Sequence, residues 1–286
     1  MKIIVNNIKY ELDTYNPTAK VIGYKDESVE VIIPDFIEYE NEKYKVTSIG
    51  MFAFYWCDSL TSITIGNGVT SIREFAFGNC SSLTSFTIPN SVTSIGDSAF
   101  CGCSRLTSIT IPNSVIEIGT WVFSGCNSLT SINIPNSVTS IGCRAFYQCS
   151  RLTSIDIPNS ITSIGLYGFH KIGIKLPKKY TEDGKLIAYK AFRTDMTCRN
   201  FQYEEGESYE IERKIKLCKC GFHACTNPLD IFNYYWGTIG TDIYIHEVYL
   251  SGDIDDDNGD SKVCASKIEI GRRLTIKDIN DIINSK

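Results

Sequence analysis

The chain has 286 residues, a formal net charge of −5 and a hydrophobic content of 43%. This length accommodates two domains, and this hydrophobic content can bury a core, which excludes a disordered chain. The acidic balance excludes the clustered basic face that nucleic-acid binding requires. No apolar run approaches the roughly 18 residues of a membrane-spanning helix, so we expect no membrane insertion.

The N-terminus, MKIIVNNIKYELD, has an apolar run of only three residues after Lys2. A secretory signal needs about 7–15 apolar residues, so we expect none in this chain and favour a cytoplasmic or virion-associated protein over a secreted one. Residues 1–20 are expected to cap a repeat array, because the open end of a repeat stack needs covering.

A unit of 23 residues, LTSIxIPNSVTSIGxxAFxxCxx, repeats along the first three-fifths of the chain. In one unit Leu106, Ile109 and Ile111 have the spacing L-x-x-L-x-L. A strand alternates its side chains, so Ile109 and Ile111 face inward together while Leu106 closes the preceding corner. One short strand cannot bury its face alone, so we expect the units to stack as a parallel sheet with a continuous core and short convex turns.

Three further columns recur with the same period. Each strand is expected to end at a proline, which cannot donate to a ladder, and the asparagine that follows can satisfy backbone groups of the corner. Cysteines 23 residues apart are expected to fill one core position as buried thiols in a reducing compartment, with pairing within the column as the alternative. The columns are Pro89, Pro112, Pro135 and Pro158; Asn90, Asn113, Asn136 and Asn159; and Cys57, Cys80, Cys103, Cys126 and Cys149.

These residues resemble the BspA-like leucine-rich repeats of bacterial surface proteins and some protists, over about residues 20–177. The irregular first unit also fits: residues 32–34 end a strand, residues 42–44 lie in a hairpin-like insertion, and residues 46–50 resume the repeat. The resemblance implies a solenoid that binds or adheres to a partner. Members are usually exported, and the absence of a signal in this chain departs from that pattern.

Two outward surfaces of the repeats could bind a partner. The strand face offers neutral, hydroxyl-rich columns such as Thr87 and Thr110, which steer charged partners weakly. The turns carry variable residues, among them aromatic rings and an arginine, the residue types that dominate binding hot spots. Packing under the turns or against the second domain is the alternative role for these residues. The candidate partner-binding residues are Phe52, Tyr55, Trp56, Phe75, Trp121, Arg144, Tyr147 and Tyr167.

The periodicity stops after Pro177, and the polar segment 178–185, with its Asp-Gly turn signal, indicates a connection. We therefore predict an α+β protein, with a leucine-rich-repeat solenoid and its N-terminal cap over residues 1–177 and a small α+β domain over residues 178–286. Helices are expected after Asn227, where a proline follows, and after Thr275, which begins a capping box. Strands are expected over residues 186–193, 198–204, 215–225, 242–250 and 263–270.

The second domain contains two groups that could hold a metal ion. Cysteine and histidine side chains, which are zinc ligands, are as closely spaced here as in zinc sites. They are Cys198, Cys218, Cys220, His223 and Cys225. Ordinary thiols are favoured there, because a glycine interrupts the strand before the histidine. The acidic run of residues 253–260 begins like a calcium loop, but its glycine comes one position late and Cys264 replaces the bidentate glutamate, which favours a solvated hairpin tip. We therefore predict no bound metal.

The adjacent residues His246 and Glu247 lie on one predicted strand. Neighbouring residues of a strand face opposite sides, so these two side chains cannot cooperate directly.

The segments KAF, TCRNFQYEEGESYE, CGFHACTNPLDIFNYY and LSGDIDDDNGDSKVCASKI are similar to a domain of unknown function of phage and bacterial proteins, over about residues 187–283. Residues 221–224 and the tyrosine-bearing helix after them are similar to the central motif of ADP-ribosyltransferases. That resemblance implies an NAD site, although Ala191 stands where a glycine often follows the first-strand motif. The implied catalytic residues are His223, Tyr189 and either Glu247 or Glu269, and the implied cofactor-binding residues are Lys190, Tyr234 and Tyr235.

The sequence favours a non-catalytic interaction protein with a protein partner and no cofactor, either of adhesion type or a structural or accessory protein of a phage particle. The alternative is an NAD-dependent, ADP-ribosyltransferase-like enzyme whose repeats select the target.

Overall fold

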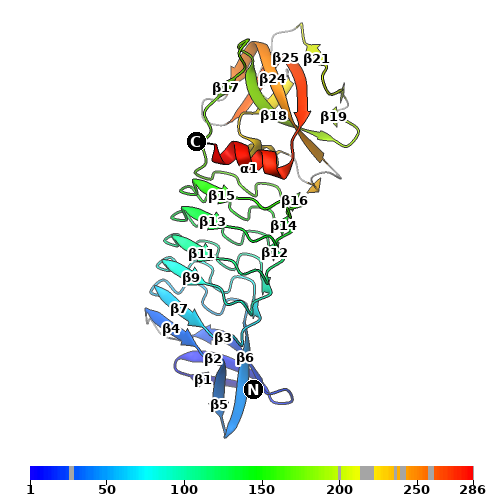
Figure 1. Ribbon diagram of the computed structural model, residues 1–286. Coiled ribbons are helices and arrows are strands. Elements are labelled where there is room, and N and C mark those ends of the chain that lie inside the picture. Colours follow the sequence, from blue (N-terminus) through cyan, green and yellow to red (C-terminus); the bar gives the residue numbers. More distant parts are fainter. Residues whose placement is uncertain are drawn as a thin grey trace. The chain divides into compact units, whose positions relative to one another are not determined.

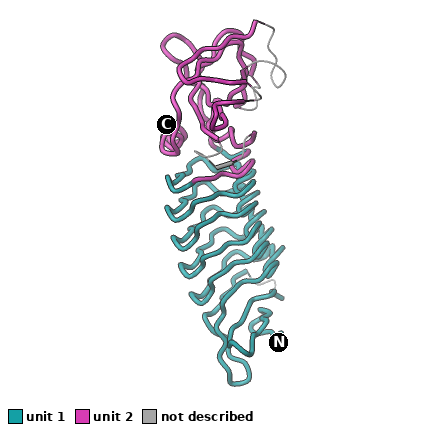
Figure 2. The backbone as a smooth tube through the Cα atoms, turned by 90° about the vertical axis from the view of Figure 1, so that its right-hand side faces the viewer, with its two compact units in different colours: residues 1–161, 171–173 teal, residues 162–170, 174–286 magenta. Residues whose placement is uncertain are grey.

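The computed structural model describes residues 1–25, 29–198, 201–212, 222–234, 237–238, 243–256 and 261–285. The chain divides into two compact units, shown in different colours in Figure 2. Unit 1 comprises Met1–Ile161 with Lys171–Gly173, and unit 2 comprises Thr162–His170 with Ile174–Lys286. The division therefore falls within the last repeat rather than where the periodic sequence ends.

Unit 1 begins with an antiparallel meander of β1 (Lys2–Val5), β2 (Ile8–Asp13) and β3 (Thr18–Tyr24). β3 pairs in parallel with β6 (Glu42–Ile49), so the meander continues directly into the repeats as the expected cap. β5 (Phe36–Tyr39) pairs antiparallel with the first half of β6, which is the hairpin-like insertion predicted from the sequence.

The repeats stack as two ladders of short strands (Figure 1). Paired residues lie 23 positions apart, as Ser85 and Ser108 do in one ladder and Ile118 and Ile141 in the other. The parallel stack of 23-residue units is therefore confirmed. The strand face consists of β4 (Glu30–Ile33), β7 (Ser62–Ile65), β9 (Ser85–Thr87), β11 (Ser108–Thr110), β13 (Ser131–Asn133) and β15 (Ser154–Asp156). The second ladder continues from β6 through β8 (Ser71–Ile72), β10 (Ser94–Ile95), β12 (Glu117–Ile118) and β14 (Ser140–Ile141), and β16 (Ser163–Ile164) is the equivalent strand in unit 2.

The turns form a third set of backbone contacts between repeats. The N–H of Phe77 donates to the carbonyl of Ala99 at 2.8 Å, and the N–H of Phe100 donates to the carbonyl of Val122 at 3.0 Å. The buried phenylalanine rings stack beneath these bonds, with the centroids of Phe77 and Phe100 5.5 Å apart and their planes at 9°. Backbone groups of each repeat are thus paired with its neighbours on all three sides, as buried polar groups require.

The corner after each strand differs from the prediction. The carbonyl of Pro89 accepts from the N–H of Val92 at 3.0 Å and closes a tight turn. The hydroxyl of Ser91 donates to the carbonyl of Val69 in the preceding repeat at 2.6 Å. Asn90 is exposed, and no hydrogen bond given for the described residues involves its side chain. The serine after the asparagine therefore satisfies the backbone at this corner.

The cysteines of the column are free thiols, and the predicted burial holds for Cys80, Cys103, Cys126 and Cys149, whereas Cys57 is partly exposed. Each buried thiol donates to a backbone carbonyl of an earlier turn, for example Cys103 Sγ to the carbonyl of Phe77 at 3.1 Å. Burial raises the pKa of the thiols of Cys103 and Cys149 to about 12. Outside the column, Cys143 is exposed.

Unit 2 consists mainly of sheet. β18 (Leu186–Arg193) has the predicted bounds, and the last two predicted strands form a long hairpin of β24 (Ile243–Asp256) and β25 (Lys262–Arg273). Of the strand predicted over residues 215–225, the described part is β22 (Phe222–Cys225). The pairings β18–β22, β22–β25, β25–β24 and β24–β18 close a ring, which makes a small barrel.

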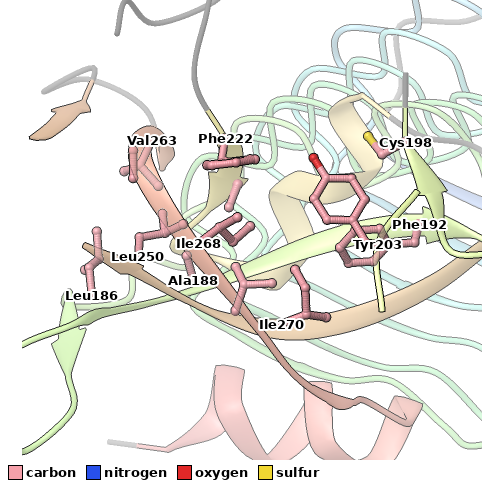
Figure 3. Packing of buried hydrophobic residues seen from close by; sticks show 13 residues of the cluster. Leu186, Ala188, Phe192, Cys198, Tyr203, Phe222, Leu250, Val263, Ile268 and Ile270 are labelled. Atoms are coloured by element: carbon pink, nitrogen blue, oxygen red, sulfur yellow. The ribbon is translucent and has the colours of Figure 1, made fainter. Parts of the chain in front are cut away.

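Thirteen buried apolar residues form a cluster in the interior of this barrel (Figure 3). Alternation along β18 places Leu186, Ala188 and Phe192 inside, where they pack with Leu250 and Ile268 of the hairpin. The predicted strand 198–204 is replaced by a short hairpin of β19 (Thr197–Cys198) and β20 (Phe201–Gln202). The other short strands are β17 (Lys179–Tyr180), β21 (Ser208–Glu210) and β23 (Gly237–Thr238).

Both predicted helix starts are present in unit 2. Asn227 caps a 3-10 helix, η1 (Pro228–Asn233), and Thr275 and Asp278 form the capping box of α1 (Ile276–Asn284). Within the described ranges α1 is the one α-helix, so the α+β description holds only in part and the chain is mainly sheet. No helix in the described part of the chain is long and apolar enough to cross a membrane.

We predict that Phe100→Ala lowers the free energy of unfolding by about 3–5 kcal/mol, because it leaves a cavity between two stacked neighbours. Phe100 is completely buried, with the ring centroid of Phe123 5.8 Å away. Urea denaturation followed by circular dichroism measures the loss. The matched control is Thr110→Ala on the exposed strand face, which should change stability by less than about 0.5 kcal/mol. Equal effects of the two changes would contradict the assigned core.

We also predict that N-ethylmaleimide at pH 8 modifies Cys143 in the native protein and leaves Cys103, Cys126 and Cys149 unmodified. The exposed thiol is accessible, whereas the buried thiols have a raised pKa and form little of the reactive thiolate. Peptide mass spectrometry of timed samples measures the rates, and denaturant should make all four thiols reactive. Modification of Cys126 at the rate of Cys143 would show that the column is accessible.

Candidate functional site

Each turn of the repeats holds two residues in the left-handed backbone conformation. This conformation costs a residue other than glycine about 1–2 kcal/mol, so glycine or asparagine suits it best. The sequence carries a signal for it, because the second position is asparagine or glycine in turns two to four. The outward column, with φ of 53–59°, is Phe52, Phe75, Ser98, Trp121, Arg144 and Tyr167. The trailing column, with φ of 57–76°, is Trp56, Asn79, Gly102, Gly125, Gln148 and Lys171.

The first turn places large rings at both of these positions. Trp56 stands where the next turn has Asn79, and its side chain is 61% exposed. Phe52 is 48% exposed. A large, exposed side chain on a strained backbone position contributes little to stability, so these rings indicate a surface role.

Four rings gather at the first two turns, and we name Phe52, Tyr55, Trp56 and Phe75 the Trp56 cluster. Phe52 and Phe75 stack with centroids 5.2 Å apart and planes at 15°. The ring of Tyr55 stands at 74° to Phe52 and at 89° to Trp56. The cluster therefore presents ring planes in two nearly perpendicular directions.

A second group, the Trp121 cluster, consists of Trp121, Arg144 and Tyr147. The guanidinium carbon of Arg144 lies 4.7 Å from the ring centroid of Trp121 and 5.9 Å from that of Tyr147. All three residues are partly buried, and the buried Ser98 separates them from the Trp56 cluster along the outward column. Seven of the predicted partner-binding residues therefore form two clusters, which spacing alone did not reveal.

The eighth predicted residue, Tyr167, belongs to unit 2. Its N–H donates to the carbonyl of Phe232 in η1 at 2.8 Å, and its ring lies 5.4 Å from that of His170. In the same segment β16 pairs antiparallel with β23. Phe232 of η1 and the strand β23 thus supply the backbone partners that the next repeat supplies elsewhere in the stack. Tyr167 makes an intramolecular contact of the kind that the alternative interpretation proposed.

Part of the candidate catalytic set gathers on the outer face of the barrel. Tyr189 lies directly opposite Glu247, and Tyr249 lies opposite Glu269. The hydroxyl of Tyr249 donates to Oε1 of Glu247 at 2.7 Å, and this bond raises the pKa of Tyr249 to about 12. Lys185 donates to Oε2 of Glu269 at 2.8 Å. Burial, with a smaller effect of Glu247, raises the pKa of Tyr189 to about 12.

Of the remaining candidates, His223 is on the same outer face, because Cys225, two residues further along β22, lies opposite Tyr189. His223 pairs across the sheet with Cys264, and Tyr234 is exposed with the ammonium of Lys262 4.5 Å from its ring centroid. Tyr235 lies outside the described residues. Lys190 follows Tyr189 on the same strand and so faces the barrel interior, where its ammonium donates to the carbonyl of His223 at 2.9 Å. Tyr189 and Lys190 are therefore on opposite faces of one strand.

His246 lies opposite Lys190 and is also buried in the interior. Its Nδ1 contacts the carbonyl of Gly271 at 3.0 Å, so Nδ1 carries the proton because a carbonyl only accepts. Nε2 is buried and has no hydrogen-bond partner among the described residues. Glu247 faces the other side, as alternation along the strand predicts. Both Lys190 and His246 therefore belong to the core face, which no local pattern in the sequence indicates.

No group of three or more histidine, cysteine or acidic side chains in the described ranges could hold a metal ion. Cys198 and Cys225 are buried, and Cys218 and Cys220 lie outside the described residues. In the acidic run, Asp253 and Asp255 belong to β24, and Asp256 pairs with Lys178. Residues 257–260 are also outside the described part of the chain.

Comparison with known families identifies both halves of the chain. A BspA type leucine rich repeat region matches residues 47–175 in six copies, and the domain of unknown function DUF7666 matches residues 186–282. The chain therefore contains a BspA-type repeat region followed by this domain. No curated protein matches the sequence.

Two solved structures share the repeat fold. A leucine rich cell surface protein from Faecalibacterium prausnitzii A2-165 is 32% identical with a TM-score of 0.52, and the match covers 60% of this chain and 46% of that protein. The leucine rich repeat protein of T. pallidum is 29% identical with a TM-score of 0.51, covering 57% of this chain and 74% of that protein. The chain thus spans less than half the length of the first protein.

Proposed function

Starting from a BspA-type repeat region over residues 47–175, we propose that the chain is a non-catalytic interaction protein that binds a protein partner through the turns of its repeats. The observation that carries this proposal is the pair Phe52 and Trp56, whose exposed rings occupy strained backbone positions. Selection for stability alone would favour glycine or asparagine there. Binding is the function that such rings serve best.

The strand face supports the choice of the turns as the binding surface. Its threonines serve the stack itself: the hydroxyl of Thr107 donates to the carbonyl of Thr84 at 3.0 Å, and that of Thr61 donates to Val29 at 2.9 Å. On β7, β9 and β11 the last exposed position of the strand is a threonine, a residue type under-represented at hot spots, and Ile32, Asn133 and Asp156 occupy the equivalent positions of β4, β13 and β15. The turns have the large rings and the arginine.

The likeness to a leucine rich cell surface protein supports a role in contacts with other proteins. Adhesion to a partner surface and assembly into a phage particle are two settings in which such a role would operate. Both settings use the same stacked repeats as a rigid support, because each repeat is held by its neighbours.

We predict that changing the turns abolishes partner binding while changing the strand face does not. The full chain is immobilised, partners retained from cell extracts are identified by mass spectrometry, and the purified partner is then titrated by calorimetry. The combined variant Trp56→Asn, Trp121→Ala and Arg144→Ala should weaken binding at least 100-fold, because hot-spot side chains contribute about 2 kcal/mol or more each. The matched control is Thr87→Lys with Thr110→Lys on the strand face. Loss of binding in the control alone would move the site to the strands.

ADP-ribosyl transfer by the C-terminal domain is the second candidate function, and one observation favours it. Tyr189 and Glu247 are cross-strand neighbours, so a ring and a carboxylate stand together as the resemblance implies. Lys190, the implied cofactor contact, faces the interior instead. The non-catalytic proposal therefore remains the stronger one.

We predict that NAD at millimolar concentration does not change the melting temperature of the full chain. A ligand that binds only the folded state raises that temperature by mass action, so differential scanning fluorimetry detects binding directly. A rise that Glu247→Gln and His223→Ala both remove, and that Glu204→Gln leaves intact, would assign an NAD site and overturn the prediction.

A further inference from the structure

The Trp121 cluster shows that the aromatic rings of the turns can bind a cationic side chain. In turn five, Arg144 stands in the outward column and Tyr147 follows three residues later, and the guanidinium of Arg144 lies over the rings of both Trp121 and Tyr147. A guanidinium over an aromatic face is attracted by the ring quadrupole, most strongly by tryptophan. The protein thus fills one of its aromatic clusters with its own cation.

The Trp56 cluster is built on the same outward column and the same tyrosine position, but different side chains occupy them. In turn one Tyr55 corresponds to Tyr147, and Phe52 stands where Arg144 stands in turn five. In the described part of the chain, no lysine or arginine is found over the rings of this cluster. Arg73, in the neighbouring turn, has its Nε 3.4 Å from Oε2 of Glu74. The rings of the Trp56 cluster are therefore open to a cation from outside.

The ring of Tyr55 is held in place at both ends. A Cβ at Gly78 would lie 2.8 Å from Cδ2 of Tyr55, so this ring can lie across turn two only because residue 78 is glycine. At the other end, Asn79 Nδ2 donates to the hydroxyl of Tyr55 at 3.4 Å. A ring fixed before binding loses less entropy when a ligand arrives.

Three acidic residues adjoin the cluster through backbone hydrogen bonds. The N–H of Asp58 donates to the carbonyl of Trp56, the carbonyl of Glu74 accepts from Phe52, and the carbonyl of Asp97 accepts from Phe75. The carboxylate of Asp97 accepts from the N–H of Thr120 at 2.8 Å and so faces the following repeat, which leaves Asp58 and Glu74 beside the one guanidinium of Arg73, a net charge of −1. Lys20, whose side chain lies at Gly50, is paired with Glu11 at 3.6 Å. The surroundings therefore favour a cationic ligand.

We infer that the Trp56 cluster binds an arginine side chain of the protein partner, with the guanidinium against the rings of Tyr55 and Trp56 and the nearby carboxylates attracting its charge. This inference rests on the proposed function and adds the chemical group that the turns recognise. Arginine fits better than lysine, because its flat guanidinium stacks on aromatic faces and is more weakly hydrated.

The test uses the full chain and two fluorescein-labelled peptides. One carries two arginines in a glycine–serine background, and its twin carries citrulline, which has nearly the same shape but no charge. Fluorescence anisotropy measures binding at low and at high salt. The arginine peptide should bind at least about tenfold more tightly than the citrulline peptide, since a desolvated cation–aromatic contact is of that size. Its advantage should shrink at high salt, which screens the carboxylates.

Three variants locate the site. Trp56→Asn places in turn one the residue that turn two already has, and Gly78→Ala displaces Tyr55 while keeping every ring and charge. Each should weaken binding of the arginine peptide about tenfold, with melting curves confirming that the variants fold. The matched control, Phe36→Ala, removes an exposed ring of β5 outside the turns, over which the ammonium of Lys43 already lies 4.4 Å from the centroid, and should leave binding unchanged.

Four outcomes would overturn the inference: equal binding of the two peptides, no binding of the arginine peptide, unchanged binding in both Trp56→Asn and Gly78→Ala, or an equal loss in Phe36→Ala. Binding of tetramethylammonium without binding of the arginine peptide would assign a small quaternary ligand and would also overturn it. A partner captured through the turns that binds equally well after its arginines are replaced would end this inference alone. Loss of the captured partner only in the strand-face variants would instead end the proposed function.

Discussion

Backbone pairing between repeats at an interval of 23 residues is the constraint on which the rest of unit 1 depends. This pairing occurs on three sides of each repeat. Each residue therefore lies next to the residue at the equivalent position of the following repeat, which is often of the same type. Buried columns such as the stacked phenylalanines and the free thiols follow directly. Because each repeat contacts only its neighbours, the stack is stable only as an array and not as single units.

The same pairing leaves an edge at each end of such an array, and unpaired strand edges invite unwanted association. At the start, β3 pairs with β6 and so brings the meander of β1, β2 and β3 against the first repeat. In unit 2, η1 and β23 pair with the segment that contains β16 and Tyr167. One structural role of the C-terminal domain is therefore to supply backbone partners to the last turn.

Pairing also fixes the backbone conformation of the turns, and this links the fold to the proposed function. The left-handed positions recur in every turn, whatever residue occupies them. Ser98 and Gly102 accept this geometry at a buried turn, whereas Phe52 and Trp56 project large rings from it. The fold thus provides regularly spaced outward positions, and the side chains placed there differ from turn to turn. Recognition can vary in this way without a change in the core.

The sequence by itself determined the features that are local or periodic: the 23-residue interval, the inward columns, the bounds of β18 and the capping box of α1. These depend on neighbouring residues or on a repeated pattern. Only the tertiary structure decided that β18, β22, β24 and β25 close into a barrel and that Lys190 and His246 lie inside it. It alone placed Arg144 over Trp121 and left the Trp56 cluster without a cation of its own among the described residues. The reason is physical: strand pairing between distant segments, and the turn conformation that pairing imposes, decide which side chains meet.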